Sequence, residues 1–411
     1  MPLSSSARPV ASPSPAKRHT SFHWLFGLFT LAMRSGGELT RVAGEMHHTV
    51  TAAPMPWDAK HQADFSKAPK VYKLVKLVFE YGSDSIHQWV NRLPGQTPAS
   101  GALVRMRSAL NGVVGDKLVE WDHLLAMGME TVDELGNDIQ LSQLNLQKRK
   151  SLVLFVHGLC LSEHDWQGPG HSELVAKLRE QGHQVAWIRY NTGLPIWENG
   201  RQLAELLDQY WTQTKPRKSS ITMIGHSMGG LVIRSANHYA EKQRHAWLVA
   251  SHNAAYLASP HAGAPLEKIG NFSNSMLGAT PYSKPLMALG NIRSRGIRSL
   301  RHANVTEPEH ENAPQPWLPM SDKSHHLLVG ARRFYESGNR WLGDGLVPED
   351  SAMGGPYFPQ QHPNVERVML DQVGHLALLQ DHRMYVYLQR WLIKRGVLED
   401  QEGEGKAGFF R

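Results

Sequence analysis

The strongest chemical signal in the sequence is a serine set between glycines, in the stretch Gly225-His226-Ser227-Met228-Gly229. The residues before it are typical of a buried strand and those after it of a helix, so the serine is predicted to lie on a sharp strand-to-helix turn. Gly225 and Gly229 are small because side chains there would collide across the turn, and His226 is expected to support it. The positive end of the helix favours negative charge that develops at the serine oxygen. The pattern predicts a nucleophilic serine.

A serine hydroxyl is a poor nucleophile unless a neighbouring base takes its proton. In chains with this strand-turn-helix pattern, an acidic residue follows the serine and the histidine comes last. His375 follows the last predicted strand and precedes the last predicted helix, which makes it the candidate base. His362 lies before that strand and His382 within the predicted helix, so both are poorly placed.

The acid that orients the histidine is predicted to follow the preceding strand, at 326–329. Asp344 lies there between two glycines on a loop. It would hold the imidazole of His375 in the required tautomer and stabilise the imidazolium without becoming protonated itself. Asp350, on the same loop, is the second candidate. Asp371 lies too close to His375 along the chain.

Two backbone amides are predicted to complete the site. The apolar run 152–156 is typical of a buried strand, and it ends in His157 and Gly158. Where the chain turns, Leu159 would present its N–H beside the serine, and the second N–H would come from Met228. Two such donors stabilise the oxyanion of a tetrahedral intermediate. We expect His157 and Gly158 to support this turn rather than to react.

The elements that must position these residues alternate along the second half of the chain. Strands are predicted at 152–156, 183–190, 221–224, 247–251 (with an extension toward 257), 326–329 and 365–370, and helices at 200–214, 229–243 and 377–394. Alternating strands and helices predict a mostly parallel sheet with helices on both faces. Ligands bind such sheets outside the carboxyl ends of the strands, where the candidate residues lie.

The chain divides into regions that differ in composition and in hydrophobic periodicity. We predict a disordered tail with a short apolar segment at 1–35, a helical N-terminal region at 36–149, an α/β domain at 150–396 and a polar tail at 397–411. Within the α/β domain, the stretch at about 266–320 breaks the alternation and is rich in Gly, Asn, Ser and Pro, which predicts a cap over the strand ends.

The N-terminal third has two open interpretations. Apolar residues recur at helical spacing between residues 39 and 125, which indicates helices whose apolar stripe packs on the α/β domain or meets a membrane. We favour packing. The apolar segment Phe22–Met33 follows basic residues, but no cleavage site closes it, so we favour a surface-binding helix over a cleaved signal peptide. We expect a cytoplasmic protein, with peripheral membrane contact through this region left open.

The candidate motifs together resemble those of the α/β-hydrolase superfamily, and within it the branch of bacterial lipases and GPI inositol-deacylase-like serine esterases. The resemblance covers about residues 150–396. It is carried by Val156-His157-Gly158-Leu159, Gly225-His226-Ser227-Met228-Gly229-Gly230, Ser259-Pro260-His261-Ala262-Gly263, Gly343-Asp344-Gly345-Leu346-Val347 and Gly374-His375.

The resemblance implies an α/β-hydrolase fold and a serine hydrolase of carboxylic esters that works without an organic cofactor. By position, Ser227 matches the nucleophile of the family, Asp344 its acid, His375 its base, and Leu159 with Met228 its oxyanion donors. The segment around His261 is interpreted as structural. The substrate class implied is a lipid-like acyl ester. The chain differs from secreted lipases in its helical N-terminal region and in lacking a clear signal peptide.

Composition excludes several other classes. The chain has 411 residues with 41% hydrophobic and 20% charged residues, and no apolar stretch reaches the length of a spanning helix. The net charge of +7 is dispersed, so we expect an ordinary solvated surface and no nucleic-acid partner. Cys160 is the single cysteine, which excludes an internal disulfide framework and a Cys-cluster zinc site. We expect no metal.

The esterase function has two alternatives. One is a thioesterase or acyltransferase of the same fold, and the other is a non-catalytic membrane-associated binding protein.

Overall fold

The computed structural model describes residues 101–144, 150–214, 219–278, 293–310, 324–333 and 343–400, with a few isolated positions outside these ranges. The described residues fall into two compact units. The larger contains 104–117 and the chain from 127 onward, and the smaller contains 101–103 and 118–126. The predictions for the segment Phe22–Met33 and for a membrane contact there lie outside the described residues. Among the helices that are described, none is both long and apolar enough to span a bilayer.

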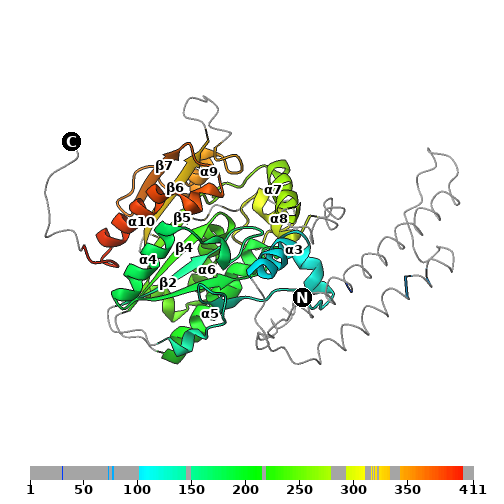
Figure 1. Ribbon diagram of the computed structural model, residues 1–411, viewed down its shortest axis with the longest axis horizontal. Coiled ribbons are helices and arrows are strands. Elements are labelled where there is room, and N and C mark those ends of the chain that lie inside the picture. The colour runs from blue at the N-terminus through cyan, green and yellow to red at the C-terminus, as the bar shows by residue number, and fades with distance from the viewer. Residues whose placement is uncertain are drawn as a thin grey trace, which may run out of the picture. The chain divides into compact units, whose positions relative to one another are not determined.

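The centre of the larger unit is a seven-stranded sheet in the order β1-β3-β2-β4-β5-β6-β7 (Figure 1). All neighbouring strands are parallel except β1, which pairs with β3 in antiparallel register. The strands are β1 Glu130–Val132, β2 Ser151–Val156, β3 Gln184–Arg189, β4 Ser220–His226, β5 Ser251–Leu257, β6 His325–Arg332 and β7 Val365–Asp371. Strand β2 has β3 on one side and β4 on the other, so the order of strands reverses there.

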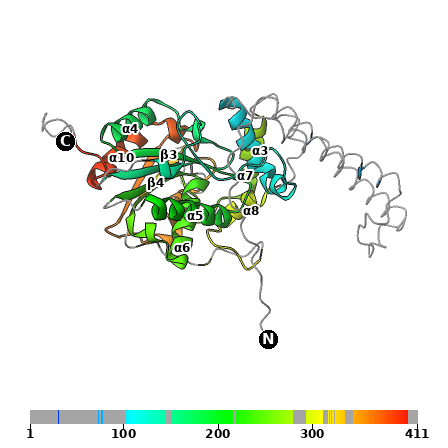
Figure 2. The same ribbon diagram turned by 90° about the horizontal axis from the view of Figure 1, so that it is seen from below.

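Helices cover both faces of the sheet (Figure 2). Helices α5 and α6 pack together on one face, and α4 and α10 pack on the other. The described helices are α3 Gly101–Glu120, α4 Pro169–Glu180, α5 Ile196–Thr214, α6 Met228–Gln243, α7 Leu266–Gly278, α8 Arg295–Arg301, α9 Glu349–Ala352 and α10 His382–Lys394. Short 3-10 turns are η2 Leu141–Gln143, η3 Glu163–Asp165, η4 Ala246–Ala250, η6 Gly355–Tyr357 and η7 Ala377–Gln380. The predicted fold class, a mostly parallel sheet between helical layers, is confirmed.

The strands are apolar because they are covered on both faces. Every residue of β2 is buried, so no side of the strand needs polar side chains. Val153 and Phe155 point to the face covered by α4 and α10, where they join one apolar cluster with Leu174 and Leu388. The alternate side chains of β2 point to the opposite face, where α6 packs against the strand. This two-sided burial keeps the strand ends, and the loops that follow them, in fixed positions.

One predicted strand was wrong at its start. Residues 247–250 form the 3-10 turn η4, and the strand begins at Ser251. The apolar run there does not distinguish a strand from a buried turn. Tertiary packing decides it, because Trp247 is fully buried and its indole N–H donates to the carbonyl oxygen of Ala204 on α5 at 3.1 Å.

Three further boundaries differ from the sequence prediction. Strand β1 adds a strand to the sheet from the region predicted to be helical. The helix predicted at 377–394 begins at His382, and the turn η7 precedes it. Val397 and Leu398 are buried in the core cluster, so the α/β domain extends beyond residue 396.

Helix α3 packs on the α/β domain through small residues. A Cβ atom added to Gly112 would lie 2.3 Å from Sγ of Cys160, which follows β2. The carbonyl oxygen of Gly112 accepts a hydrogen bond from the Ser294 hydroxyl at 2.6 Å, and Asp116 accepts one from the Arg295 amide at 3.0 Å. Over this stretch of the N-terminal region, the structure has the packing contacts that we favoured. Cys160 itself is buried, as expected of a small apolar residue.

Candidate active site

Ser227 lies on the turn between β4 and α6. Its φ of 54° and ψ of −122° are strained for a residue with a side chain, and the backbone is held there by the bond from its amide to the carbonyl oxygen of Leu257, at 2.8 Å. The side chain is 2% exposed. Strain of this kind is tolerated only where the surrounding structure enforces it, and here it turns the serine oxygen out of the strand at the start of α6.

Glycines make this turn possible because the backbone approaches itself closely. A Cβ atom on Gly225 would lie 2.5 Å from the amide nitrogen of Gly230, and one on Gly229 would lie 2.2 Å from the carbonyl oxygen of Val156. Both distances are shorter than real Cβ contacts. A Cβ on Gly158 would lie 2.9 Å from the Cβ of Ser227, so the loop after β2 passes directly against the serine.

The structure brings Ser227, His375 and Asp344 together from three different loops. Nε2 of His375 lies 2.9 Å from Oγ of Ser227, and Nδ1 of His375 lies 2.6 Å from Oδ2 of Asp344. The second carboxylate oxygen of Asp344 accepts hydrogen bonds from the amides of Leu346 and Val347, at 2.9 and 2.8 Å. The carboxylate is thereby fixed in its orientation toward the imidazole.

The environment of Asp344 keeps it ionised. Burial by itself would raise the pKa of this carboxyl group, but the neighbouring charge and hydrogen bond of His375, with the two loop amides, lower the pKa below its usual value. The other candidate acids lie elsewhere. Asp350 is exposed on α9, and Asp371 forms an ion pair with Arg332.

The two predicted amide donors lie on either side of this turn. Leu159 follows Gly158 in the loop after β2, and Met228 is the first residue of α6. Both residues are buried. Within the described part of the chain, neither of their backbone N–H groups donates to another residue, which is expected at the first position of a helix. Both donors therefore remain available next to the serine.

Two further histidines hold this arrangement in place. Nε2 of His226 donates to the carbonyl oxygen of His375 at 3.1 Å, which fixes the backbone of that loop. The ring of His157 stacks on Tyr190, with centroids 4.5 Å apart, and the Tyr190 hydroxyl donates to the His157 carbonyl oxygen at 2.7 Å. Burial lowers the pKa of both imidazoles, to about 3 for His226. Both imidazoles are therefore neutral at pH 7, which fits buried side chains that support the site through hydrogen bonds and ring stacking.

We predict that His226 makes the fold sensitive to acid. Its pKa is about 3 in the folded protein, through burial and then the charge of His375, against about 6.5 in an unfolded chain. As the pH falls below 6.5, the unfolded chain binds a proton that the folded one does not, so stability is lost. At pH 5 this loss is about 2 kcal/mol. Urea unfolding at pH 7 and pH 5 should show a loss smaller by about this amount in His226→Gln than in the wild type.

The matched control for this prediction is His382→Gln, because His382 is exposed at the start of α10. Its pH dependence should equal that of the wild type. An equal loss of stability in His226→Gln and the wild type would contradict a buried neutral imidazole at position 226.

A cleft of about 460 Å³ opens beside Asp344 and His375, which both line it. Lys268 and Phe272 of α7 line it as well, together with Leu346 and Leu376. The ring of Phe272 meets the imidazole of His375 edge to face, with centroids 6.0 Å apart. Helix α7 comes from the stretch predicted to be a cap. Phe272 and Lys268 could not be identified from the sequence, because the weak periodicity of that stretch does not show which residues face the strand ends.

Residues 146–336 match a protein family described as "Putative serine esterase (DUF676)". This stretch contains β2 to β6 and the turn that carries Ser227. The sheet domain has the α/β-hydrolase fold. The match agrees with the resemblance inferred from the sequence motifs. Asp344 and His375 lie beyond the matched stretch, so their place in the site depends on the hydrogen bonds described above.

Several solved structures are similar to this chain at low identity. The mature form of lipase BlEst2 from Bacillus licheniformis is 15% identical, with a TM-score of 0.40 over 66% of this chain and 98% of that one. Mouse alpha/beta hydrolase domain-containing protein 10 is 13% identical, with a TM-score of 0.37 over 61% and 92%. Esterase RhEst1 from Rhodococcus sp. ECU1013 is 13% identical, with a TM-score of 0.38 over 60% and 90%. No curated protein sequence matches the chain.

Among the described residues, no group of three or more His, Cys, Asp or Glu side chains is arranged to hold a metal ion. The chemistry that the site can perform with its own residues is proton transfer between an imidazole and a hydroxyl, next to two amide donors.

Proposed function

We propose that the protein is a serine hydrolase of carboxylic esters that works through an acyl-enzyme intermediate. Ser227 is the nucleophile, His375 the general base and Asp344 the residue that orients the imidazole. The observation that carries the proposal is the continuous chain of hydrogen bonds through these residues, 2.9 Å from Ser227 to His375 and 2.6 Å from His375 to Asp344. The match to a serine esterase family over residues 146–336 supports it.

In the first half of the proposed reaction, Oγ of Ser227 attacks the ester carbonyl carbon while Nε2 of His375 takes the hydroxyl proton. The resulting oxyanion accepts hydrogen bonds from the amides of Leu159 and Met228. The bond to the alcohol oxygen then breaks, and His375 gives the proton to the departing alcohol. In the second half, water attacks the acyl-enzyme by the same route, which releases a carboxylic acid and restores the serine.

The lining of the cleft supports a lipid-like acyl ester as substrate. Phe272, Leu346 and Leu376 give it apolar walls against which an acyl chain can pack. Lys268 and Arg333 add positive charge at the same cleft, which favours a substrate that carries a negative group away from the ester. Peripheral membrane contact through the N-terminal region stays a prediction.

A series of p-nitrophenyl esters with acyl chains from acetyl to palmitoyl tests this function. We expect hydrolysis, with kcat/KM rising from acetyl toward medium chains as more of the apolar wall is covered. Parallel assays with a thioester, and with an added alcohol as acyl acceptor, separate an esterase from a thioesterase or an acyltransferase of the same fold. A pure, folded protein that hydrolyses none of these esters would point to a non-catalytic binding protein instead.

A further inference from the structure

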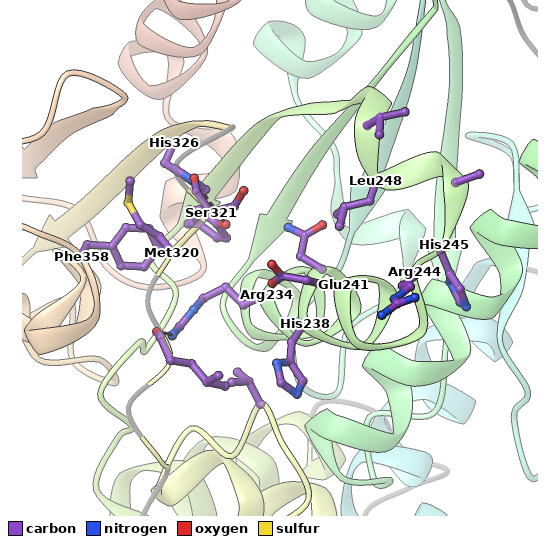
Figure 3. Close-up of a pocket in the computed structure, with 16 residues that line it drawn as sticks. Arg234, His238, Glu241, Arg244, His245, Leu248, Met320, Ser321, His326 and Phe358 are labelled. Carbon is purple, nitrogen blue, oxygen red and sulfur yellow. Dashed lines mark hydrogen bonds between the residues drawn. The ribbon is translucent and has the colours of Figure 1, made fainter.

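A second cavity, of about 410 Å³, lies along helix α6 and shares no lining residue with the cleft at Asp344 and His375. We call it the α6 pocket. Arg234 and Arg244 border it on the helix, and Met320 and Phe358 border it on the opposite side. Figure 3 shows Arg234 extending from α6 toward the side on which Met320 and Phe358 lie. The proposed esterase reaction uses none of these residues.

The inner part of the α6 pocket holds the buried guanidinium of Arg234. Arg234 is 8% exposed. A guanidinium has five N–H donors, and this one makes two hydrogen bonds, to Nδ1 of His261 and to the carbonyl oxygen of Leu318, each at 3.4 Å. Both distances are long for N–H donors. Within the described part of the chain, no carboxylate forms an ion pair with Arg234.

Aromatic rings replace the missing carboxylate only in part. The guanidinium carbon of Arg234 lies 4.8 Å from the ring centre of Tyr357 and 5.5 Å from that of Phe358. Cation–π contacts of this kind stabilise the faces of the guanidinium but add no acceptor for the N–H groups at its edge, which have only the two long hydrogen bonds among the described residues. Burial lowers the pKa of Arg234 to about 10, so the side chain still carries its charge at neutral pH. A buried charge without a counter-charge is unfavourable, which makes this edge a strong site for an anion.

The other groups of the α6 pocket favour one negative charge joined to an apolar chain. Leu248 and the 77% exposed Val249 extend the apolar surface toward the rim, where Arg244 is exposed. Glu241 is the one acid among the described residues that line the pocket, and it is exposed as well. His326 is neutral, because burial lowers its pKa to about 4, and both its ring nitrogens already have hydrogen-bond partners.

We propose that the α6 pocket binds an amphiphilic carboxylate, with the carboxylate paired to Arg234 and the apolar chain lying along α6. The planar guanidinium edge fits a carboxylate through two parallel hydrogen bonds. A single buried cation neutralises the single negative charge of a carboxylate. A doubly charged phosphate would keep one negative charge that Arg234 does not neutralise. The inference does not depend on the proposed esterase function.

Calorimetric titration of the full chain with octanoate and with octanol tests the proposal. The two probes share an apolar chain and differ in charge, so the ratio of their affinities isolates the contribution of Arg234. In the wild type we expect octanoate to bind at least about tenfold more tightly than octanol, as for a charge-assisted hydrogen-bonded pair. Arg234→Met should abolish this preference. Arg244→Met, which removes the same charge from the exposed rim of the same helix, should retain it.

Equal affinity for the two probes in the wild type would overturn the proposal, and so would a preference that survives in Arg234→Met or that disappears in Arg244→Met. If Arg234→Met fails to fold, Arg234→Lys takes its place. Lysine keeps the charge but loses the fork that pairs with both carboxylate oxygens. Octanoate should then bind about tenfold more weakly while octanol binds as before, and an unchanged octanoate affinity would overturn the proposal.

Discussion

Ser227→Ala should abolish ester hydrolysis while the fold survives. The variant lacks the oxygen that attacks the ester and that lies 2.9 Å from His375. In comparable serine enzymes, loss of the nucleophile lowers kcat on the order of 10⁶-fold. Alanine fits the space of a side chain that is 2% exposed and occupies the same backbone conformation. Steady-state kinetics with p-nitrophenyl butyrate measure the loss, and thermal unfolding checks the fold.

Ser172→Ala is the matched control for this variant, since Ser172 is exposed on α4. It should retain wild-type kcat and KM. A folded Ser227→Ala protein that keeps most of its activity would remove Ser227 from the reaction and, with it, the proposed mechanism.

Asp344→Asn should lower kcat by about 10⁴-fold, as in a comparable triad. The oxygen of the new amide can still accept hydrogen bonds from Leu346 and Val347, so the loop keeps its conformation. Its NH₂ group then faces Nδ1 of His375, where the carboxylate stood at 2.6 Å. A donor in this position stabilises the tautomer that carries its proton on Nε2, which cannot accept the proton of Ser227. The effect should therefore appear in kcat.

Asp350→Asn provides a matched comparison on the segment that follows the same loop. Asp350 is exposed on α9, so the change should alter kcat less than about twofold. The same kinetic assay is used for both variants. A large loss in Asp350→Asn together with a small one in Asp344→Asn would transfer the role of the acid to Asp350.

The sequence predicted the candidate site more completely than its surroundings. The turn at Ser227 could be predicted from neighbouring residues alone. Its glycines are needed because the backbone approaches them too closely for a side chain. His375 and Asp344 could be inferred because the order of residues along the chain limits which loops reach the serine. Asp344 follows β6 and His375 follows β7, and these two strands are parallel neighbours in the sheet. The loops after parallel neighbouring strands lie at the same edge of a sheet.

Features that depend on long-range packing could not be predicted. The turn at Trp247 contains the apolar residues of a strand, and only its hydrogen bond to Ala204 on α5 distinguishes it. The contact between Phe272 and His375 joins a stretch of weak periodicity to a distant loop. The incomplete hydrogen bonding of Arg234 depends on which described groups surround a buried side chain, and no pattern within the sequence carries that information.

Labelling with a fluorophosphonate, followed by mass spectrometry of the digested protein, tests the central claim most directly. This reagent forms a covalent bond with a serine whose hydroxyl is activated by a neighbouring base, and the labelled peptide identifies the residue. We predict one label per chain, on Ser227, with labelling abolished in Ser227→Ala and strongly slowed in Asp344→Asn. Folded wild-type protein that stays unlabelled, or that carries its label on another serine, would contradict the account.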